Sequence, residues 1–219
     1  MITYAMFSRQ GKRENNEDCI RMKEKKGAKV FLLADGLGGH GAGEVASQMT
    51  VEYGAGLFEC MERYDQYLPE LFENAQRRLL MRQKRYHASE QMKTTLVALL
   101  IDKEKVSWAH IGDSRLYFFE NGFLKKRTAD HSVPQMLVKS GEISEKEIRT
   151  HPDRNRLLRV MGNEWPENSY DVSSVVELKR GMSFLMCSDG FWEYITEECK
   201  KRSALVKYNG KDCFAKWTR

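Results

Sequence analysis

The stretch Val30-Phe31-Leu32-Leu33-Ala34-Asp35-Gly36-Leu37-Gly38-Gly39-His40 joins a continuous apolar run to an acidic residue and then to a glycine-rich loop. The apolar run predicts a buried strand over 30–34 that stops at Asp35-Gly36. The glycines that follow give the loop high backbone freedom. Beyond the loop, apolar residues at every fourth position predict a helix: Val45, Met49, Tyr53 and Leu57.

A second helix is predicted downstream of the first, followed by a region of strands. The helix runs from about Leu68 to Tyr86, and its apolar face consists of Leu68, Leu71, Phe72, Ala75 and Leu79. Buried strands are predicted over 94–101 and 106–111. The strands 115–119 and 123–127 flank Asn121-Gly122, which predicts a hairpin because both residues tolerate positive φ.

The last part of the predicted fold combines a polar helix with another hairpin. The helical stretch covers 134–149 and includes Ser144 and Glu147 at capping-box spacing. The segments 171–178 and 183–187 predict a hairpin across Arg180-Gly181. Two helices followed mostly by strands indicate an α+β domain, with antiparallel sheets covered by helices. No repeat or linker divides the 219 residues, so we expect one domain.

The composition excludes several classes of protein. Charged residues make up 31% and hydrophobic residues 41%, which is typical of soluble globular chains. The net charge of +5 is dispersed, whereas a nucleic-acid binder would show a dense basic stripe. No apolar run reaches the roughly 20 residues that span a membrane. The amino terminus lacks a signal pattern, and the five cysteines are widely spaced without CxxC, so we expect a cytoplasmic protein with reduced thiols.

Acidic residues recur where apolar strands end. They stand in Ala34-Asp35-Gly36, in Ile111-Gly112-Asp113-Ser114 and in Cys187-Ser188-Asp189-Gly190, and Asn16-Glu17-Asp18 adds a fourth acidic motif. A single Asp-Gly pair is most simply a turn in which the aspartate caps the chain. Three strand-terminal aspartates favour a shared carboxylate site, and converged carboxylates normally hold hard divalent cations because they otherwise repel one another.

A set of ordered motifs carries a resemblance to a known family. The motifs are 13–18 (RENNED), 34–40 (ADGLGGH), 43–47 (GEVAS), 94–96 (TTL), 111–115 (IGDSR), 130–132 (DHS) and 187–192 (CSDGFW). In this order and spacing the chain resembles the metal-dependent type-2C Ser/Thr protein phosphatases in their compact bacterial form, over residues 1 to about 196. The resemblance implies a four-layer αββα sandwich of two antiparallel sheets, with a binuclear Mg²⁺ or Mn²⁺ site at one end.

The resemblance also implies roles for individual residues. Asp35 resembles the carboxylate that bridges two metal ions, and the Gly36 carbonyl resembles a ligand of the second ion. Asp189 resembles a ligand of the first ion. Glu17 and Asp18 resemble residues that hold metal-bound waters, and Asp113 resembles a ligand, together with Asp189, of a third and weaker ion. Arg13 resembles the arginine that binds the substrate phosphate, for which a guanidinium fork is well suited.

The physical chemistry of the implied reaction agrees with these roles. Hydrolysis of a phosphomonoester needs charge neutralisation and a nucleophile at neutral pH. Two cations about 4 Å apart supply both, because they lower the pKa of a bridging water. The resemblance implies in-line attack on seryl and threonyl phosphates without a covalent enzyme intermediate.

Other polar residues have competing interpretations. His40 could approach the leaving oxygen as a general acid, or it could serve only the structure of its loop. His131 and His151 border the segment that resembles the family's flap, and structural roles are favoured for both. Cys187 is expected in the core rather than as a nucleophile. Ser114 has no evident base partner, which argues against a serine hydrolase.

The carboxyl-terminal part departs from the family pattern. Family members continue with a helix and a strand that ends in a Gly-x-Asp-Asn-x-Thr-like motif, whose aspartate completes the first metal site. Here the resemblance fades after Thr196, and the basic segment 197–219 offers Asp212 without a following Asn. We therefore expect a phosphatase-like domain over 1–196 and a divergent tail over 197–219. The C-terminal helix and strand are expected to be missing or altered.

The sequence predicts a phosphoprotein Ser/Thr phosphatase whose activity could be reduced by this tail. Its substrates would be phosphoproteins, the targets of a Ser/Thr kinase, and its cofactors two Mn²⁺ or Mg²⁺ ions with a third, weaker one. The alternative is an inactive relative that binds phosphoproteins through Arg13 and part of the metal site. No nucleic-acid or membrane partner is expected.

Overall fold

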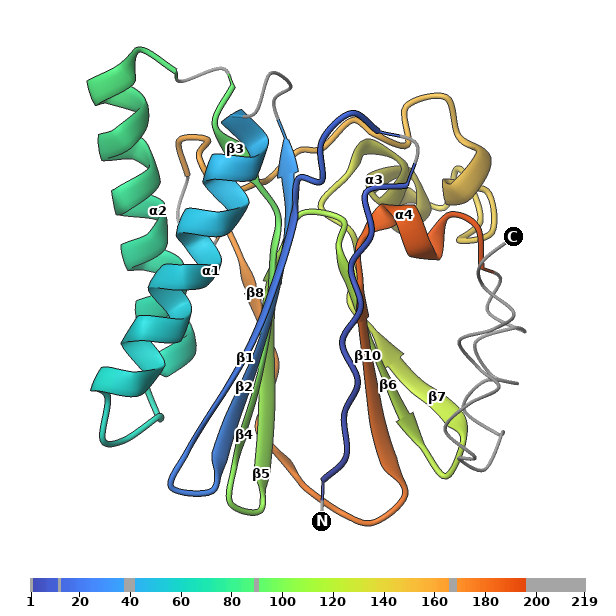
Figure 1. The fold of residues 1–219 in the computed structure, drawn as a ribbon. Coiled ribbons are helices and arrows are strands. Elements are labelled where there is room, and N and C mark those ends of the chain that lie inside the picture. The colour runs from blue at the N-terminus through green and yellow to red at the C-terminus, as the bar shows by residue number, and fades with distance from the viewer. Residues whose placement is uncertain (1, 12, 38–41, 89–90, 166–168, 196–219) are drawn as a thin grey trace.

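The computed structural model describes residues 2–11, 13–37, 42–88, 91–165 and 169–195. Two antiparallel sheets face each other in this structure (Figure 1). The larger sheet has the order β1 (Asp18–Lys25), β2 (Ala28–Leu37), β4 (Leu96–Asp102), β5 (Lys105–Ile111), β8 (Asp171–Val172), with β3 (Lys93–Thr94) on β2 and β9 (Val176–Glu177) on β5. The smaller sheet has the order β10 (Met182–Cys187), β6 (Arg115–Glu120), β7 (Phe123–Arg127).

Helices flank the two sheets. The long helices α1 (Ala42–Cys60) and α2 (Tyr67–Tyr86) cover the outer face of the larger sheet (Figure 1). The helices α3 (Val133–Ser140) and α4 (Asp189–Trp192) and the 3₁₀ turn η1 (Ile148–Thr150) lie at one end of the sandwich. The α+β fold of two antiparallel sheets flanked by helices is therefore confirmed. The expected change in the C-terminal helix and strand lies outside the described residues. None of the helices described has both the length and the apolar character needed to cross a membrane.

Burial of apolar side chains holds the layers together in three clusters. The first lies between the larger sheet and the two long helices, and includes Val30, Leu32, Phe58 and Phe72. The second lies between the sheets and includes Val97, Leu99, Trp108 and Phe118. The third lies on the other side of the smaller sheet and includes Tyr117, Ile148, Cys187 and Trp192. Burial of each large apolar side chain contributes roughly 1.5–3 kcal/mol to this packing.

Most predicted elements are present with shifted ends. The predicted strand over 30–34 is part of β2, but β2 continues through Asp35 to Leu37 because Gly36 and Leu37 pair with Thr94 and Lys93. The predicted strand over 94–101 is interrupted at Thr95, between β3 and β4. The Asn121-Gly122 hairpin is confirmed, and both residues have positive φ.

The two predicted helices are also confirmed. Every residue of the predicted apolar face of α2 is buried. In α1 the four apolar residues of the pattern are only half-buried. Its buried residues are Val51 and Phe58 together with a set of small ones: Gly43, Ala46, Ser47, Thr50, Gly54 and Ala55. Small side chains on this face let α1 lie close to β2.

Two predictions from the last third of the chain are wrong. The segments 171–178 and 183–187 do not form a hairpin, because β8 and β9 pair with β5 in the larger sheet while β10 pairs with β6 in the smaller one. The predicted helix over 134–149 ends at Ser140. Gly141 then adopts φ 82, and its N–H bonds to carbonyls of the preceding turn, which terminates α3.

Candidate metal centre

Four aspartates from distant parts of the chain meet at one end of the sandwich, and we call them the four-aspartate cluster: Asp18, Asp35, Asp113 and Asp189. Asp18 of β1 is paired directly across from Asp35 of β2. Asp113 follows the end of β5, and Asp189 is the first residue of α4. The carboxylate of Asp35 interacts electrostatically with each of the other three. The structure therefore brings together the strand-terminal aspartates that the sequence singled out.

The electrostatics of the four-aspartate cluster are unfavourable without a cation. Burial, followed by the nearby charges of Asp189, Asp18 and Asp113, holds the pKa of Asp35 well above its usual range. Burial and the charge of Asp189 do the same to the pKa of Asp113. The pKa of Asp18 is also raised by burial, although a hydrogen bond from the Ser188 hydroxyl at 2.9 Å opposes the rise. Like-charged carboxylates at this proximity cannot all ionise without compensating positive charge.

The donor chemistry of the four-aspartate cluster fits hard divalent cations. Carboxylate oxygens are the preferred ligands of Mg²⁺ and Mn²⁺. Among the described residues, the ligand atoms of only one group of three or more lie within 4.8 Å of one another, and that group is His110, His131 and Asp171. Within the four-aspartate cluster, the Asp35 carboxyl group forms side-chain hydrogen bonds with both Asp18 and Asp189 and so links these two carboxylates.

The end of β2 is held by contacts that require glycine. The Gly36 N–H donates to the Glu17 carbonyl at 3.0 Å. A Cβ on Gly36 would overlap the backbone carbonyl group of Gly43, and a Cβ on Gly43 would lie 2.7 Å from Glu17 Oε1. The close approach of Gly36 and Gly43 therefore fixes the start of α1 against the strand that carries Asp35.

Two threonines hold the backbone of Asp35. The Thr95 hydroxyl accepts from the Asp35 N–H at 3.0 Å, and the Thr94 hydroxyl donates to the Asp35 carbonyl at 2.8 Å. Thr95 Oγ1 also lies 2.8 Å from Ser114 Oγ, next to Asp113. The sequence marked 94–96 only as part of a resemblance. The positioning role was missed because the bonded residues lie about sixty positions apart in the chain.

Asp113 is held in a similar way by α4 and by the neighbouring strand. The Trp192 indole N–H donates to the Asp113 carbonyl at 2.9 Å. The Arg115 guanidinium carbon lies 3.5 Å from the centre of the Trp192 ring, and Arg115 forms a two-pronged ion pair with Asp130 at 2.8 and 2.6 Å. These buried groups connect the Asp113 and Asp189 ends of the four-aspartate cluster.

Arg13 and Glu17 lie at the rim of the four-aspartate cluster. Arg13 is exposed, and its Nη1 lies 4.0 Å from Glu17 Oε2. The positive charge of Arg13 acts on Asp18 and opposes the rise of its pKa. An exposed guanidinium beside the carboxylates is available to an anionic ligand. His40 and Asp212 lie outside the described residues.

Other expectations about polar residues can be compared with the structure. Cys187 is buried in the core, as expected. Ser114 is buried against Thr95, and no histidine or carboxylate is among its hydrogen-bond partners in the described part of the chain. His151 Nδ1 accepts from the Asp153 N–H at 3.1 Å, which is a local structural contact.

Comparison with known proteins identifies the family. Residues 8–210 match the family model of protein phosphatase 2C. The serine/threonine phosphatase stp of Listeria welshimeri is 33% identical over 193 residues, which are 84% of this chain and 75% of that protein. A solved bacterial serine phosphatase superposes with a TM-score of 0.81 at 31% identity, covering 92% of this chain and 83% of its own.

A second solved structure carries metal ions. It is the catalytic domain of the serine/threonine protein phosphatase PstP in complex with two manganese ions, similar at a TM-score of 0.70 and 30% identity over 89% of this chain and 84% of its own. The chain belongs to the protein phosphatase 2C family, in the compact bacterial serine/threonine phosphatase form.

Proposed function

We propose that this chain hydrolyses phosphoserine and phosphothreonine on proteins at a divalent metal centre built on the four-aspartate cluster. The observation that carries the proposal is the convergence of Asp35 with Asp189, Asp18 and Asp113 in a phosphatase family member, where burial and mutual repulsion raise the carboxyl pKa values of Asp35, Asp18 and Asp113. The natural substrates would be phosphoproteins made by a Ser/Thr kinase. Cys19 and Cys60 form no disulfide within the described part of the chain, which is consistent with action in the cytoplasm.

Different residues of the chain would bind the metal ions and the substrate phosphate. Asp35 and Asp189 would hold the two principal ions with the Gly36 carbonyl, Glu17 and Asp18 would act through waters, and Asp113 with Asp189 would hold a third ion. When bound, Mn²⁺ or Mg²⁺ neutralises the phosphate charge and lowers the pKa of water, so that a nucleophile exists near neutral pH. The exposed Arg13 binds and orients the substrate phosphate at the rim.

The activity itself is tested by hydrolysis assays with Mn²⁺. We expect release of phosphate from p-nitrophenyl phosphate and from a phosphothreonine peptide, and no release by Asp35→Ala. Turnover by the wild-type protein that does not exceed that of Asp35→Ala would contradict the proposal.

The tail raises a second candidate, a protein that binds phosphoproteins without hydrolysing them. Residues 197–219 contain one aspartate, Asp212, in a context unlike the family motif. If Asp212 does not bind the first ion, that ion has one carboxylate ligand fewer. The affinity for a hard cation is then lower, because it depends on the number and negative charge of the ligands. The two candidates differ in one observable: a binding module retains phosphopeptide unchanged, whereas a phosphatase consumes it.

We expect the dependence of activity on Mn²⁺ concentration to report this ligand. With the carboxylate missing, activity should be low at submillimolar Mn²⁺ and should rise without saturation into the millimolar range. Replacement of the residues after Thr196 by a family-like helix and Asp-Asn strand should restore tight binding. Binding of two Mn²⁺ ions with micromolar affinity by the unaltered chain would show instead that Asp212 or another residue supplies the ligand.

Arg13→Ala is expected to raise KM while leaving Mn²⁺ affinity unchanged, because the proposed metal ligands are separate residues. Loss of a charge-assisted hydrogen bond to phosphate costs about 1.5–3 kcal/mol, which corresponds to a KM increase of about tenfold or more. Arg9→Ala is the matched control, because Arg9 is also exposed but stacks on Phe7. A lower melting temperature with unchanged KM would mean that Arg13 is only structural.

A further inference from the structure

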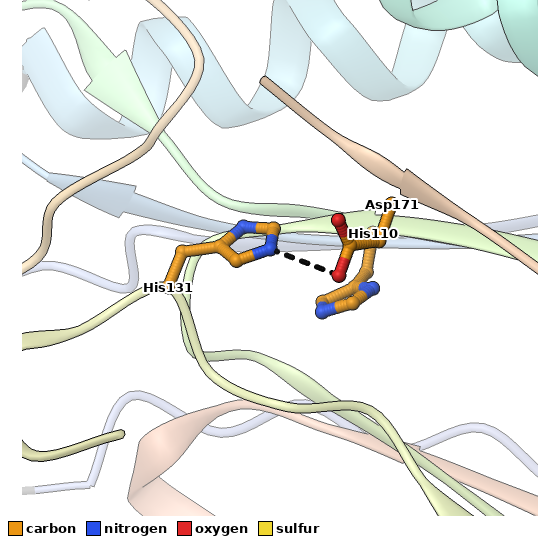
Figure 2. A group of neighbouring side chains, drawn as sticks. All are labelled: His110, His131 and Asp171. Atoms are coloured by element: carbon orange, nitrogen blue, oxygen red, sulfur yellow. Dashed lines mark ion pairs between the residues drawn. The ribbon is translucent and has the colours of Figure 1, made fainter. Parts of the chain in front are cut away.

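A pair of stacked histidines beside Asp113 has no part in the function proposed so far. His110 of β5 and His131 are each only 3% exposed, and their rings stack with centroids 4.7 Å apart (Figure 2). Asp171 of β8 is paired with His110 across the sheet, and its side chain faces His131 (Figure 2). The ligand atoms of these three residues lie within 4.8 Å of one another.

His131 holds both polar backbone groups of Gly112, the residue before Asp113. The backbone N–H of His131 donates to the Gly112 carbonyl at 2.9 Å, and the backbone N–H of Gly112 donates to the ring atom Nδ1 of His131 at 3.2 Å. Gly112 has φ 97, and a Cβ there would lie 2.6 Å from Thr95 Cγ2. This glycine sets the direction in which the chain leaves β5, and His131 fixes it in that conformation.

The bond from Gly112 determines where the proton of His131 lies. Because Nδ1 accepts from a backbone N–H, its lone pair is occupied, and the proton of the neutral ring must be on Nε2. Burial, the neighbouring His110 and Arg159 lower the pKa of His131 to about 3, so the ring is neutral at pH 7. Nε2 is buried and has no hydrogen-bond partner among the described residues; the group it faces is Asp171 Oδ2, at 3.4 Å.

The same hydrogen bonds argue against a metal ion between these residues. A metal would need the Nε2 lone pair of His131, which the proton occupies while Nδ1 accepts from Gly112. The two rings are also nearly parallel, with an angle of 19° between their planes, so lone pairs that lie in those planes do not converge. His110 Nε2 already bonds to the Ala129 carbonyl at 2.8 Å. The cluster is therefore better described as a support for Gly112.

We propose that His131 is a positioning residue: its Nε2 proton is directed at Asp171, its Nδ1 accepts from the Gly112 N–H, and the Asp113 carboxylate is thereby held towards the metal centre. This inference rests on the proposed function, because Asp113 matters only if it binds metal. Residues that orient metal ligands typically change metal affinity by about 10–100-fold when they are replaced.

Two substitutions at position 131 test the contacts of the two ring nitrogens one at a time. In His131→Asn the amide oxygen takes the place of Nδ1 and keeps an acceptor for Gly112. In His131→Gln the amide nitrogen takes the place of Nε2 and keeps a donor for Asp171, but Gly112 loses its acceptor. Both variants lose the ring and its stacking on His110, so they should unfold at similar temperatures. His151→Gln is the matched control, because His151 bonds to Asp153 and not to Gly112.

The readouts are Mn²⁺ binding by calorimetry, activity against Mn²⁺ concentration, and the imidazole nitrogen resonances of the metal-free protein by NMR. We expect His131→Gln to raise the Mn²⁺ concentration for half-saturation of the Asp113-dependent ion by about tenfold or more, while His131→Asn stays close to the wild type. The resonances of wild-type His131 should show a protonated Nε2 and an unprotonated Nδ1.

Each contrary outcome has a distinct meaning. Equal Mn²⁺ affinities of His131→Asn and His131→Gln, whether both weakened or both unchanged, would overturn the positioning role and leave the phosphatase proposal intact. A protonated Nδ1 in the wild-type spectrum would overturn it without any variant. Failure of the wild-type protein to bind Mn²⁺ would overturn the proposed function, and the role of Asp113 on which this inference rests would fall with it.

Discussion

Asp35→Asn is expected to abolish Mn²⁺ binding and hydrolysis and, at the same time, to raise the melting temperature of the metal-free protein. The amide offers one neutral acceptor oxygen where the carboxylate offers two charged ones, so the proposed bridge between ions is lost. Removal of a buried, uncompensated charge relieves about 1–3 kcal/mol. For a chain of this size each kcal/mol corresponds to about 2–4 °C. Calorimetric scans with and without Mn²⁺ measure both effects.

The stabilisation by Asp35→Asn should depend on pH in a defined direction. The folded-state pKa of Asp35 is raised, so its contribution to stability is present at low pH and is lost as pH rises through that raised value. The variant should therefore gain most over the wild type at pH 8 and least near pH 4, the unfolded value. The buried histidines act in the opposite direction because their pKa values are lowered, but they are the same in both proteins and cancel in the difference. A variant that is less stable than the wild type at pH 8 without metal, or that still binds two ions, would contradict the assignment.

Asp130→Ala is expected to lower the free energy of unfolding by about 3–5 kcal/mol, because it leaves the buried charge of Arg115 without its partner. The side chains of Asp130 and Arg115 are 1% and 5% exposed, and Arg127 also bonds to Asp130 at 3.2 Å. Urea denaturation measures the loss. The matched control is Asp65→Ala, which breaks an ion pair with Arg63 whose side chains are 86% and 65% exposed, and which should cost about 1 kcal/mol or less.

A small loss in Asp130→Ala, comparable to that in Asp65→Ala, would mean that the surrounding protein relaxes around Arg115. The buried charge of Arg115 would then not depend on Asp130 as its partner.

The parts of the fold that could be predicted from sequence are those with a strong local signal. The apolar run before Asp35, the helical period of α2 and the Asn121-Gly122 turn each identify an element without knowledge of its neighbours. Strand pairing could not be predicted in the same way near Gly181. The Leu178 N–H bonds to the Glu104 carbonyl beside the larger sheet, whereas the Gly181 carbonyl accepts from the Asn121 N–H beside the smaller one, so residues only three positions apart contact different sheets. Local patterning does not name the partner strand.

The candidate site shows the same division. Its aspartates were found because they stand at the ends of apolar strands within recognisable motifs. Thr95, Trp192 and His131 also lie in the quoted motifs, and a structural role was expected for His131. Their specific contacts were not predicted, because each acts on the backbone of a residue far away in the sequence. A threonine, tryptophan or histidine in a strand or loop has many ordinary structural uses, and only the folded chain shows which backbone group it contacts.

The number of Mn²⁺ ions bound per chain shows whether Asp18, Asp35, Asp113 and Asp189 form one centre for several ions. Equilibrium dialysis at increasing Mn²⁺ concentrations, continued until the bound metal reaches a plateau and followed by metal analysis, measures this number even if affinity is weak. We expect at least two ions per wild-type chain at saturation and their loss in Asp35→Asn. Binding of one ion or none, or an unchanged number in Asp35→Asn, would contradict this expectation.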